Sequence, residues 1–419
     1  MLFKFLGGAQ EVGRSSILMR ERGGSSLLLD CGVKLADKPE YPIEVPNVDA
    51  FILSHAHIDH SGAAPTIYGE QMVPAFGTQP TLDFSELLLE DSLQIARKEH
   101  LQERFHKRQI KSFMNRYVPM NYGRAVDFRD MEITMHDAGH ISGSAITLVE
   151  RKHAQSNRRI VYTGDYKIEP QFLHKGAEFI ESDILVTEST CSLRGHPNRE
   201  ETVSKIIEKI REVLESGGNV LLPSFAVGRA QEMLVMLYKN GLIEQTYVDG
   251  MARQATRIAL RYKGFVTDWE SLNAAAHKAV FVESIADRLD ALSKPSVILT
   301  TAGMLNGGPA IGYIKKLNGR SEILLTGYQV EGTNGRMLLE RGAIRDGGHE
   351  IRVHATATYF DLSAHAGREE LFGYVKRSKP STVICVHGDE QASTSMAEAL
   401  KLEGYEAYAP KIGETIKLY

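Results

Sequence analysis

The chain has 419 residues, of which 42% are hydrophobic and 24% are charged. This composition is typical of a globular protein, and the length predicts two domains, because a single core rarely grows beyond about 250–300 residues. The formal net charge of −4 excludes a general electrostatic attraction to nucleic acid. A polyanion would have to be bound by local positive charge or by metal ions.

No apolar run approaches the roughly 20 residues needed to cross a bilayer. The first residues, MLFKF, are typical of a strand rather than of a signal peptide. We therefore expect no membrane association and a cytoplasmic location. The cysteines Cys31, Cys191 and Cys385 are widely spaced and odd in number, which argues against a disulfide framework and against a cysteine-zinc site.

Up to about Glu188, short apolar runs alternate with polar or glycine-containing turns, a pattern that predicts strands. The expected strands are 26–30, 50–53, 131–135, 145–149, 160–162 and 184–186. Residues 81–116 are polar and helical in character. Their basic side chains can form a solvated helix face or an RNA contact, and the solvated face is the favoured interpretation. The basic run 151–159 predicts a hairpin turn at the surface.

After Cys191 helices and strands alternate regularly, which is typical of a doubly wound parallel sheet. The expected elements are a helix at 200–215, a strand at 219–223, a helix at 229–239 and strands at 246–249, 297–301 and 323–326. A strand at 382–386 follows in the last segment. If the late histidines join the early ones, the middle domain is an insertion, with domains at 1–190 and 356–419 around 191–355.

The motif HxHxDH at residues 55–60 follows an apolar strand and places four ionisable groups within six positions. Such a dense cluster is costly unless a cation organises it. The turn can direct His55 and His57 at one ion while Asp59 and His60 face a second one. Zinc, manganese or iron would suit these nitrogen and oxygen donors. A solvated histidine-rich loop is the alternative for a lone HxH pair.

Four further residues stand on turns that directly follow apolar runs: Asp30, His140, Asp165 and His387. Turns at strand ends are where a rigid scaffold presents reactive groups. Taken singly, each of these residues is more easily explained as a structural residue. Their common position after strands makes them candidates for the same site as the HxHxDH motif.

The complete set of motifs resembles the metallo-β-lactamase superfamily. The run LGGAQEVGRSS at 6–16, Glu188, the sequence SAH at 363–365 and His387 resemble its β-CASP branch, whose members cleave RNA or DNA. TTAGMLNGGP at 300–309 resembles the archaeal ribonucleases related to the cleavage and polyadenylation specificity factor, and the RNase J-like nucleases are similar. The resemblance implies a metallo-β-lactamase αββα sandwich with an inserted β-CASP domain, of α/β class and with a doubly wound parallel sheet.

The resemblance also implies two zinc ions per chain, with manganese as the alternative metal. One ion would be bound by His55, His57 and His140, the other by Asp59, His60 and His387, and Asp165 would bridge both. Asp30 would orient a ligand histidine without binding metal itself. Two metals about 3.5–4 Å apart can activate water and neutralise the charge that develops on a scissile phosphate.

The 3′ oxygen that leaves on cleavage needs a proton. The resemblance assigns this proton transfer to Glu188 and His365, and it also implies that Asp59 is a catalytic residue. A neighbouring carboxylate favours the protonated imidazole, so His365 can act as an acid near neutral pH. An ordinary ion pair is the alternative. The products would carry 5′-phosphate and 3′-hydroxyl ends. Ser363, Gly307 and Gly308 are the candidate contacts to substrate, although glycine pairs more often permit tight turns.

The expected substrate is single-stranded RNA, in turnover or processing. The sequence contains neither the KH-type modules of some archaeal relatives nor the extra carboxy-terminal domain of RNase J. This favours a 5′-to-3′ exoribonuclease over an endoribonuclease that acts in RNA 3′-end processing or transcription termination. A homodimer is expected from resemblance alone.

Two other classes of function are the alternatives. A small-molecule hydrolase of the same superfamily would lack the insertion, His365 and His387. A catalytically inactive RNA-processing scaffold would lose metal ligands, whereas every ligand position is filled in this sequence.

Overall fold

The computed structural model describes residues 1–21, 24–35, 38–151 and 158–418. They form two compact units. The first contains Met1–Pro170, Lys175–Gly195 and His365–Tyr419, and the second contains Gln171–His174 and His196–Ala364. The chain thus leaves the first unit after Gly195, forms most of the second unit and returns to the first unit at His365. The changeovers at 195/196 and 364/365 lie a few residues after the predicted domain boundaries.

Two seven-stranded sheets form the centre of the first unit. In spatial order, the first sheet contains β22 (Thr415–Lys417), β1 (Leu2–Gly7), β2 (Ser16–Arg20), β3 (Ser26–Leu29), β4 (Ala50–Ile52), β5 (Ala75–Thr78) and β6 (Tyr117–Met120). The second contains β21 (Glu406–Tyr408), β20 (Thr382–Val386), β11 (Ile184–Glu188), β10 (Arg159–Tyr162), β9 (Ala145–Arg151), β8 (Met131–Asp137) and β7 (Val126–Phe128). Each sheet has a parallel half and an antiparallel half.

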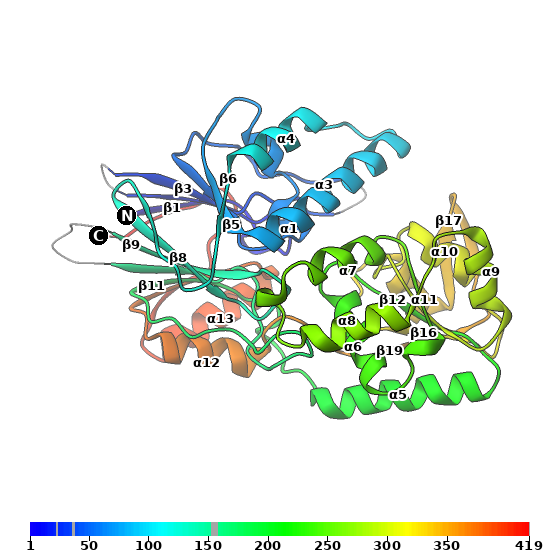
Figure 1. Ribbon diagram of the computed structural model, residues 1–419. Coiled ribbons are helices and arrows are strands. Elements are labelled where there is room, and N and C mark those ends of the chain that lie inside the picture. The colour runs from blue at the N-terminus through cyan, green and yellow to red at the C-terminus, as the bar shows by residue number, and fades with distance from the viewer. Residues whose placement is uncertain (22–23, 36–37, 152–157, 419) are drawn as a thin grey trace. The chain divides into compact units, whose positions relative to one another are not determined.

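Helices cover the outer face of each sheet, so the layers are helix, sheet, sheet and helix (Figure 1). The first sheet carries α1 (Ile58–Ser61), α2 (Ala64–Ile67), α3 (Gln79–Lys98) and α4 (Lys107–Arg116), and the second carries α12 (Arg368–Ser378) and α13 (Glu390–Leu402). Strand residues are buried on both faces: Leu27 and Leu29 belong to the core between the sheets, and Leu28 to the core under the helices. This architecture confirms the predicted αββα sandwich.

The segment 81–116, predicted to be helical in character, contains two helices. Helix α3 ends at Lys98, and α4 begins at Lys107. His106 starts the second helix because its backbone N–H donates to Oε1 of Gln109 at 2.9 Å, a capping interaction that favours a new helix start. In the region of 151–159, β9 ends at Arg151 and β10 begins at Arg159. Residues 152–157 of the predicted hairpin turn lie outside the described residues.

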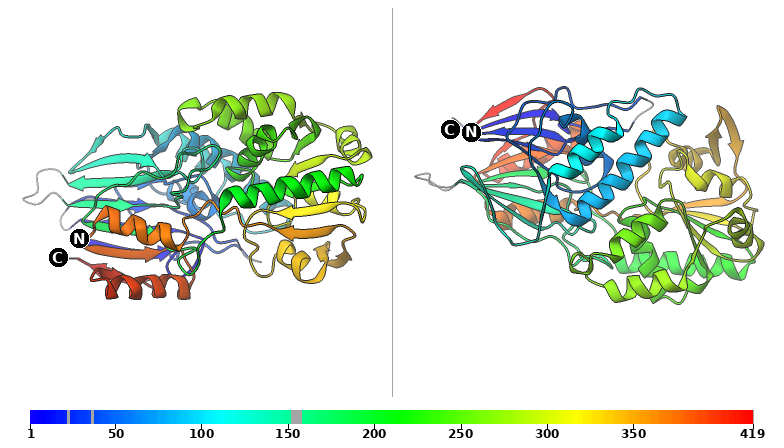
Figure 2. Two further views of the ribbon diagram at one scale, coloured as in Figure 1. Left: turned by 90° about the horizontal axis from the view of Figure 1, so that it is seen from below. Right: turned by 45° about the horizontal axis from the view of Figure 1, so that its top comes forward.

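The second unit is built on a parallel six-stranded sheet (Figure 2). Its spatial order is β14 (Val280–Phe281), β13 (Thr246–Asp249), β15 (Val297–Thr300), β12 (Val220–Pro223), β16 (Glu322–Leu325) and β19 (Thr356–Tyr359). The helices are α5 (Arg199–Glu215), α6 (Arg229–Lys239), α7 (Ala252–Leu260), α8 (Trp269–Lys278), α9 (Ile285–Ser293), α10 (Gly308–Ile314) and α11 (Asn334–Arg341), with 3₁₀ turns at Ile243–Gln245 and Lys263–Phe265 and a hairpin of β17 (Ala343–Asp346) and β18 (His349–Arg352). The predicted doubly wound sheet is thereby confirmed.

One strand pairing of the first unit joins distant parts of the sequence. Strands β11 and β20 are parallel neighbours, in a register that places Glu188 opposite Val386. Because parallel strands end at the same edge of a sheet, this register brings the turn after β20, which carries His387, beside the end of β11. The pairing therefore connects the early and the late chemical motifs.

Candidate metal centre

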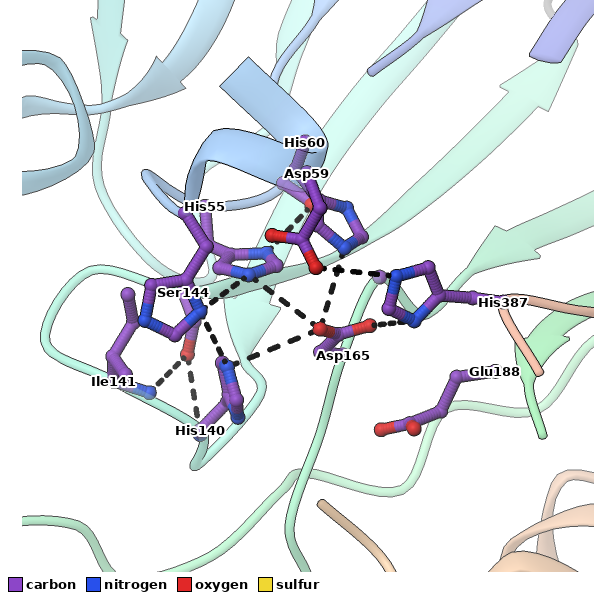
Figure 3. Close-up of polar contacts among 12 residues, drawn as sticks. His55, Asp59, His60, His140, Ile141, Ser144, Asp165, Glu188 and His387 are labelled. Atoms are coloured by element: carbon purple, nitrogen blue, oxygen red, sulfur yellow. Dashed lines mark hydrogen bonds and ion pairs between the residues drawn. The ribbon is translucent and has the colours of Figure 1, made fainter. Parts of the chain in front are cut away.

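The HxHxDH turn is fixed by its own backbone. After β4 the chain passes through His55 and His57 and enters the short helix α1, which contains Asp59 and His60. The hydroxyl of Ser61 donates to the carbonyl of Ala56 at 2.7 Å, and the N–H of His60 donates to the carbonyl of His57 at 2.9 Å. The compact turn carries four candidate ligands, and Figure 3 shows the side chains of His55, Asp59 and His60 near Asp165.

The first ligand group contains His55, His57, His140 and Asp165. Nδ1 of His57 lies 3.2 Å from Nε2 of His55 and 3.1 Å from Nε2 of His140. Oδ2 of Asp165 lies 3.6 Å from Nε2 of His55 and 4.0 Å from Nε2 of His140. Zn–N bonds of about 2.0–2.1 Å at tetrahedral angles separate neighbouring ligands by about 3.3 Å. The four atoms are therefore close enough together to surround one metal ion.

The second ligand group contains Asp59, His60, Asp165 and His387. Oδ2 of Asp165 lies 3.3 Å from Nε2 of His60, and Oδ1 lies 3.0 Å from Nδ1 of His387. Nε2 of His387 is 3.5 Å from Oδ2 of Asp59. Asp165 is common to both groups and stands at the centre of the cluster (Figure 3).

Several ligand atoms in this cluster are buried without a hydrogen-bond partner of good geometry. They are Nε2 of His60, Nε2 of His387 and both carboxylate oxygens of Asp165. Leaving buried polar atoms unpaired costs about 1–3 kcal/mol each, and more when the group is charged. A bound cation would satisfy all of these atoms, so the donor set fits a metal on energetic as well as on geometric grounds.

The electrostatics of the cluster favour cation binding. Burial, followed by the effect of nearby His60, lowers the pKa of His55 well below its ordinary value. Burial opposes ionisation of Asp165, but His387 and His60 outweigh it and hold the pKa of Asp165 well below its usual range. Burial lowers the pKa of His387, but Asp165 raises it to about 10. Protons on His387 balance the carboxylates, and a bound cation would replace them.

Asp30 is the centre of a buried hydrogen-bond network that supports the ligands. Its Oδ2 lies 2.6 Å from Nδ1 of His60 and accepts from the hydroxyl of Tyr162 at 2.6 Å. Ser54 donates to Asp30 through both its backbone N–H and its hydroxyl, at 2.8 and 2.7 Å. The same hydroxyl lies 3.0 Å from Nδ1 of His55. Through these contacts Asp30 and Ser54 orient one histidine of each ligand group.

The loop that presents His140 depends on one glycine and one serine. Gly139 has a φ of 65°, and a Cβ at this position would lie 2.5 Å from the carbonyl oxygen of Lys167. Only glycine fits there without strain. The hydroxyl of Ser144 accepts from the backbone N–H groups of His140 and Ile141, each at 3.2 Å (Figure 3). The loop is therefore held in one conformation beside His57.

Glu188 and His365 form a pair beside Asp165. Oε2 of Glu188 lies 3.0 Å from Nδ1 of His365, and Oε1 accepts from the backbone N–H of Tyr166 at 2.9 Å. The Glu188 side chain is fully buried, whereas that of His365 is 26% exposed. Burial lowers the pKa of His365, but Glu188 and Asp165 raise it to about 9. Asp165, Glu188 and His365 could also hold a cation between them.

Three of the predicted site residues belong to the second unit and are members of neither ligand group. Gly307 precedes α10, Gly308 is its first residue, and the N–H of Ser363 donates to Oδ1 of Asp361 at 3.0 Å. Near the amino terminus, the carbonyl of Gly8 accepts from the N–H of His387 at 2.7 Å. A Cβ at Gly7 would lie 2.0 Å from the carbonyl oxygen of Arg14, so this glycine pair permits a tight turn.

The supporting residues Ser54, Tyr162 and Ser144 were not predicted from the sequence. Ser54 directly precedes the HxHxDH motif, and this position is the only local signal of its role. Tyr162 is an ordinary strand residue in the sequence. Only the packing of β10 against the first sheet brings its hydroxyl to Asp30.

Among the described residues, no helix has both the length and the apolar composition needed to cross a bilayer.

Three family models match the chain. The Zn-dependent metallo-hydrolase RNA specificity domain matches residues 350–410, the Beta-Casp domain matches 230–338, and the model of the anti-Pycsar protein Apyc1 matches 7–211. A crystal structure of a protein of unknown function from Enterococcus faecalis is similar with a TM-score of 0.64 and 14% identity, covering 100% of this chain and 99% of that one. This likeness supports the fold.

Curated relatives match over 99% of the chain. The probable RNase MJ4 of Methanocaldococcus jannaschii is 38% identical over 99% of its length, and RNase aCSPSF2 of Saccharolobus solfataricus is 36% identical over 85% of its length. The transcription termination factor FttA of M. jannaschii is 33% identical, and the match covers 71% of it. With its β-CASP insert, its RNA specificity segment and its histidine and aspartate cluster, the chain belongs to the β-CASP metallo-hydrolase family of archaeal ribonucleases.

Proposed function

We propose that the protein is a dinuclear zinc-dependent ribonuclease that hydrolyses the phosphodiester bonds of single-stranded RNA and leaves 5′-phosphate and 3′-hydroxyl ends. One observation carries the proposal: two four-residue ligand groups share the carboxylate of Asp165. Two ions that share a carboxylate suit in-line displacement at phosphorus. The names of the similar RNases support RNA as the substrate.

His55, His57 and His140 would hold one zinc ion, Asp59, His60 and His387 the other, and Asp165 would bridge them. When bound, the zinc ions would lower the pKa of water for nucleophilic attack and neutralise charge on the phosphate. The chain's own contribution is to hold the seven ligands together, five of them buried, with four buried atoms of His60, His387 and Asp165 that a cation would satisfy. Asp59 is partly exposed and would also contact the attacking water.

His365 would protonate the 3′ oxygen of the departing RNA segment. Its Nδ1 faces Glu188, which leaves Nε2 as the nitrogen that can deliver a proton. Its partial exposure places it where substrate can reach it, in contrast to the ligand histidine His387, whose side chain is 3% exposed. Glu188 acts as a positioning residue, because its carboxylate fixes the imidazole and favours the protonated ring.

Asp30 would position His60 and His55 without contacting the substrate. We expect Asp30→Asn to weaken zinc binding by about 10–100-fold, because the amide cannot supply the charge that balances a histidine–zinc unit. Asparagine tolerates the left-handed φ of 56° at this position, so the backbone should be retained. Competition with a fluorescent chelator measures the change. Tyr162→Phe, which removes one hydrogen bond to the same carboxylate, should cause a smaller loss, and equal losses would contradict the assignment.

The expected mode of action is 5′-to-3′ exonucleolytic. Endonucleolytic cleavage in 3′-end processing or termination is the second candidate, and the similarity to the transcription termination factor FttA favours it. The test uses RNA labelled at its 3′ end that carries either a 5′-monophosphate or a 5′-hydroxyl, with and without chelator. Mononucleotides released only from the monophosphate RNA support the exonuclease, and discrete internal fragments from both RNAs support the endonuclease.

The same assay separates the proposed enzyme from a catalytically inactive scaffold. A scaffold would leave both RNAs intact in the presence of zinc, and this result would refute the proposed function. Ser363, Gly307 and Gly308 stay predicted substrate contacts. RNA cleavage measured with manganese added in place of zinc, after metal removal, tests which metal the protein uses.

A further inference from the structure

Two exposed aromatic side chains in the second unit have no role in the site described above. Among the described residues, Phe225 and Tyr328 are the only phenylalanine, tyrosine or tryptophan residues that are exposed, at 41% and 56%. Phe225 follows β12 by two residues and Tyr328 follows β16 by three, and these strands are parallel neighbours. Both aromatic residues therefore stand at the same, carboxyl-terminal edge of one sheet.

Two glycines, Gly303 and Gly327, lie next to Phe225. A Cβ at Gly303 would lie 3.1 Å from the backbone nitrogen of Phe225 and 3.4 Å from its ring carbon Cδ2, and a Cβ at Gly327 would lie 3.4 Å from Cε2. Gly303 follows β15 and Gly327 follows β16, the two neighbours of β12. One edge of the ring, at Cδ2 and Cε2, thus lies against both glycines, while 41% of the residue stays exposed to solvent.

A buried side chain holds these two glycine loops together. Nε2 of Gln329 donates to the carbonyl of Gly303 at 3.2 Å and to the carbonyl of Gly327 at 2.8 Å. Gln329 is only 3% exposed, so its amide is fixed. The aromatic edge consequently has a rigid base, and ligand binding there would cost little ordering of the protein.

The position of this edge within the sheet is also informative. The chain builds β12 first, proceeds to β13 and β14 on one side, returns to β15, and then crosses β12 to form β16 on the other side. In doubly wound sheets such a reversal of strand order opens a crevice at the carboxyl ends of the strands, where ligands bind. Phe225 and Gly327 flank this point of reversal.

We propose that Phe225 and Tyr328 form a stacking platform for unpaired nucleobases of the RNA substrate. The proposal rests on the proposed ribonuclease function and adds to it the feature by which the second unit grips RNA. Every base has an aromatic face, so stacking binds single strands with little sequence preference. A net charge of −4 gives the chain no general attraction to RNA, and base stacking would supply affinity that does not depend on charge.

The test compares RNA binding by Phe225→Ala, Tyr328→Ala and the unaltered metal-loaded protein. Fluorescence anisotropy measures the affinity for a short single-stranded RNA with phosphorothioate linkages, which resists hydrolysis, and for versions in which one base at a time is removed. Each alanine variant should bind intact RNA about tenfold or more weakly. Removal of the base that stacks on Phe225 should weaken the unaltered protein similarly but have little further effect on Phe225→Ala.

Matched variants separate stacking from simple apolar contact. Phe225→Trp should retain affinity, Phe225→Leu should lose most of it, and Leu289→Ala, which shortens an exposed apolar side chain on α9 of the same unit (52% exposed), should bind RNA normally. Circular dichroism checks that each variant folds. If a Phe225 variant does not fold, Tyr328→Ala tests the platform independently.

The inference is overturned if both alanine variants bind RNA within about twofold of the unaltered protein. The same holds if the affinity lost through an alanine substitution does not depend on which base has been removed from the RNA. It is also overturned if the substitutions change the oligomeric state in sedimentation but not the RNA affinity, because the platform would then contact a second copy of the chain. Failure of the proposed function looks different: the metal-loaded protein would not cleave RNA, whatever the binding data show.

Discussion

Replacing His365 by alanine should lower the turnover number by about 10²–10⁴-fold without reducing the metal content. The expected loss is the contribution of a positioned general acid, since the departing 3′ oxygen would then have to take its proton from water. The metal should stay because the two four-residue groups retain all seven of their ligands. Steady-state kinetics on RNA and metal analysis of the same preparation test both parts of this prediction.

The companion variant Glu188→Gln tests whether the carboxylate acts through the imidazole. Glu188 is 3.0 Å from His365, and its charge raises the pKa of that ring. A general acid must be protonated, so activity declines as pH rises through its pKa. Without the carboxylate, the alkaline limb of the turnover profile should move to lower pH. Loss of zinc from His365→Ala would show instead that Asp165, Glu188 and His365 bind a cation, and the acid role would have to be abandoned.

Asp165→Asn should have the second large effect, with loss of bound metal from both ligand groups. Its two oxygens face His60 and His387 at 3.3 and 3.0 Å, and its Oδ2 also faces His55 at 3.6 Å. An amide cannot bridge two cations as a carboxylate does, so the metal content should fall from two ions per chain to fewer than one. Activity should fall by about a thousandfold or more, because metals supply several kcal/mol of charge stabilisation. Elemental mass spectrometry after a mild chelator wash measures the ions retained.

Single-group variants provide the control for Asp165. His140→Ala removes a ligand from the first group only, and His387→Ala from the second group only, so each should retain more metal than Asp165→Asn. Retention of two tightly bound ions by Asp165→Asn would contradict the shared carboxylate. One ion per chain in the fully active, unaltered protein would equally rule out the dinuclear centre.

Local pattern predicted many elements closely. Helix α6 lies at the predicted residues 229–239, and strands β13 and β20 at the predicted 246–249 and 382–386. In each case the apolar spacing agrees with the burial that the fold imposes, so short-range and long-range preferences coincide. The position where one helix ends and the next begins was not predicted. The polar segment 81–116 has helical composition throughout, but a capping interaction at His106 starts a second helix within it.

The residues of the candidate site also differ in how far the sequence alone could identify them. His55, His57, Asp59 and His60 could be found from spacing alone, because six consecutive positions fix how far apart their side chains can be. Asp30, His140, Asp165 and His387 could be suggested for the same site from their turns, but their separate roles came only from resemblance. Ser54 and Tyr162 were missed, since a hydrogen bond from Tyr162 to Asp30 spans 132 positions and leaves no mark on the sequence around either residue.

The sequence by itself determined which chemical groups the protein carries, on which kind of element each stands, and the alternation that makes the second unit a parallel sheet. The tertiary structure decided which of these groups meet. The parallel register of β11 and β20 brings His387 beside Glu188, and the stacking of two sheets brings Tyr162 to Asp30. The reason is physical: side-chain spacing along a helix or strand is a local property of the backbone, whereas the convergence of turns depends on strand pairing and on the burial of apolar faces hundreds of residues apart.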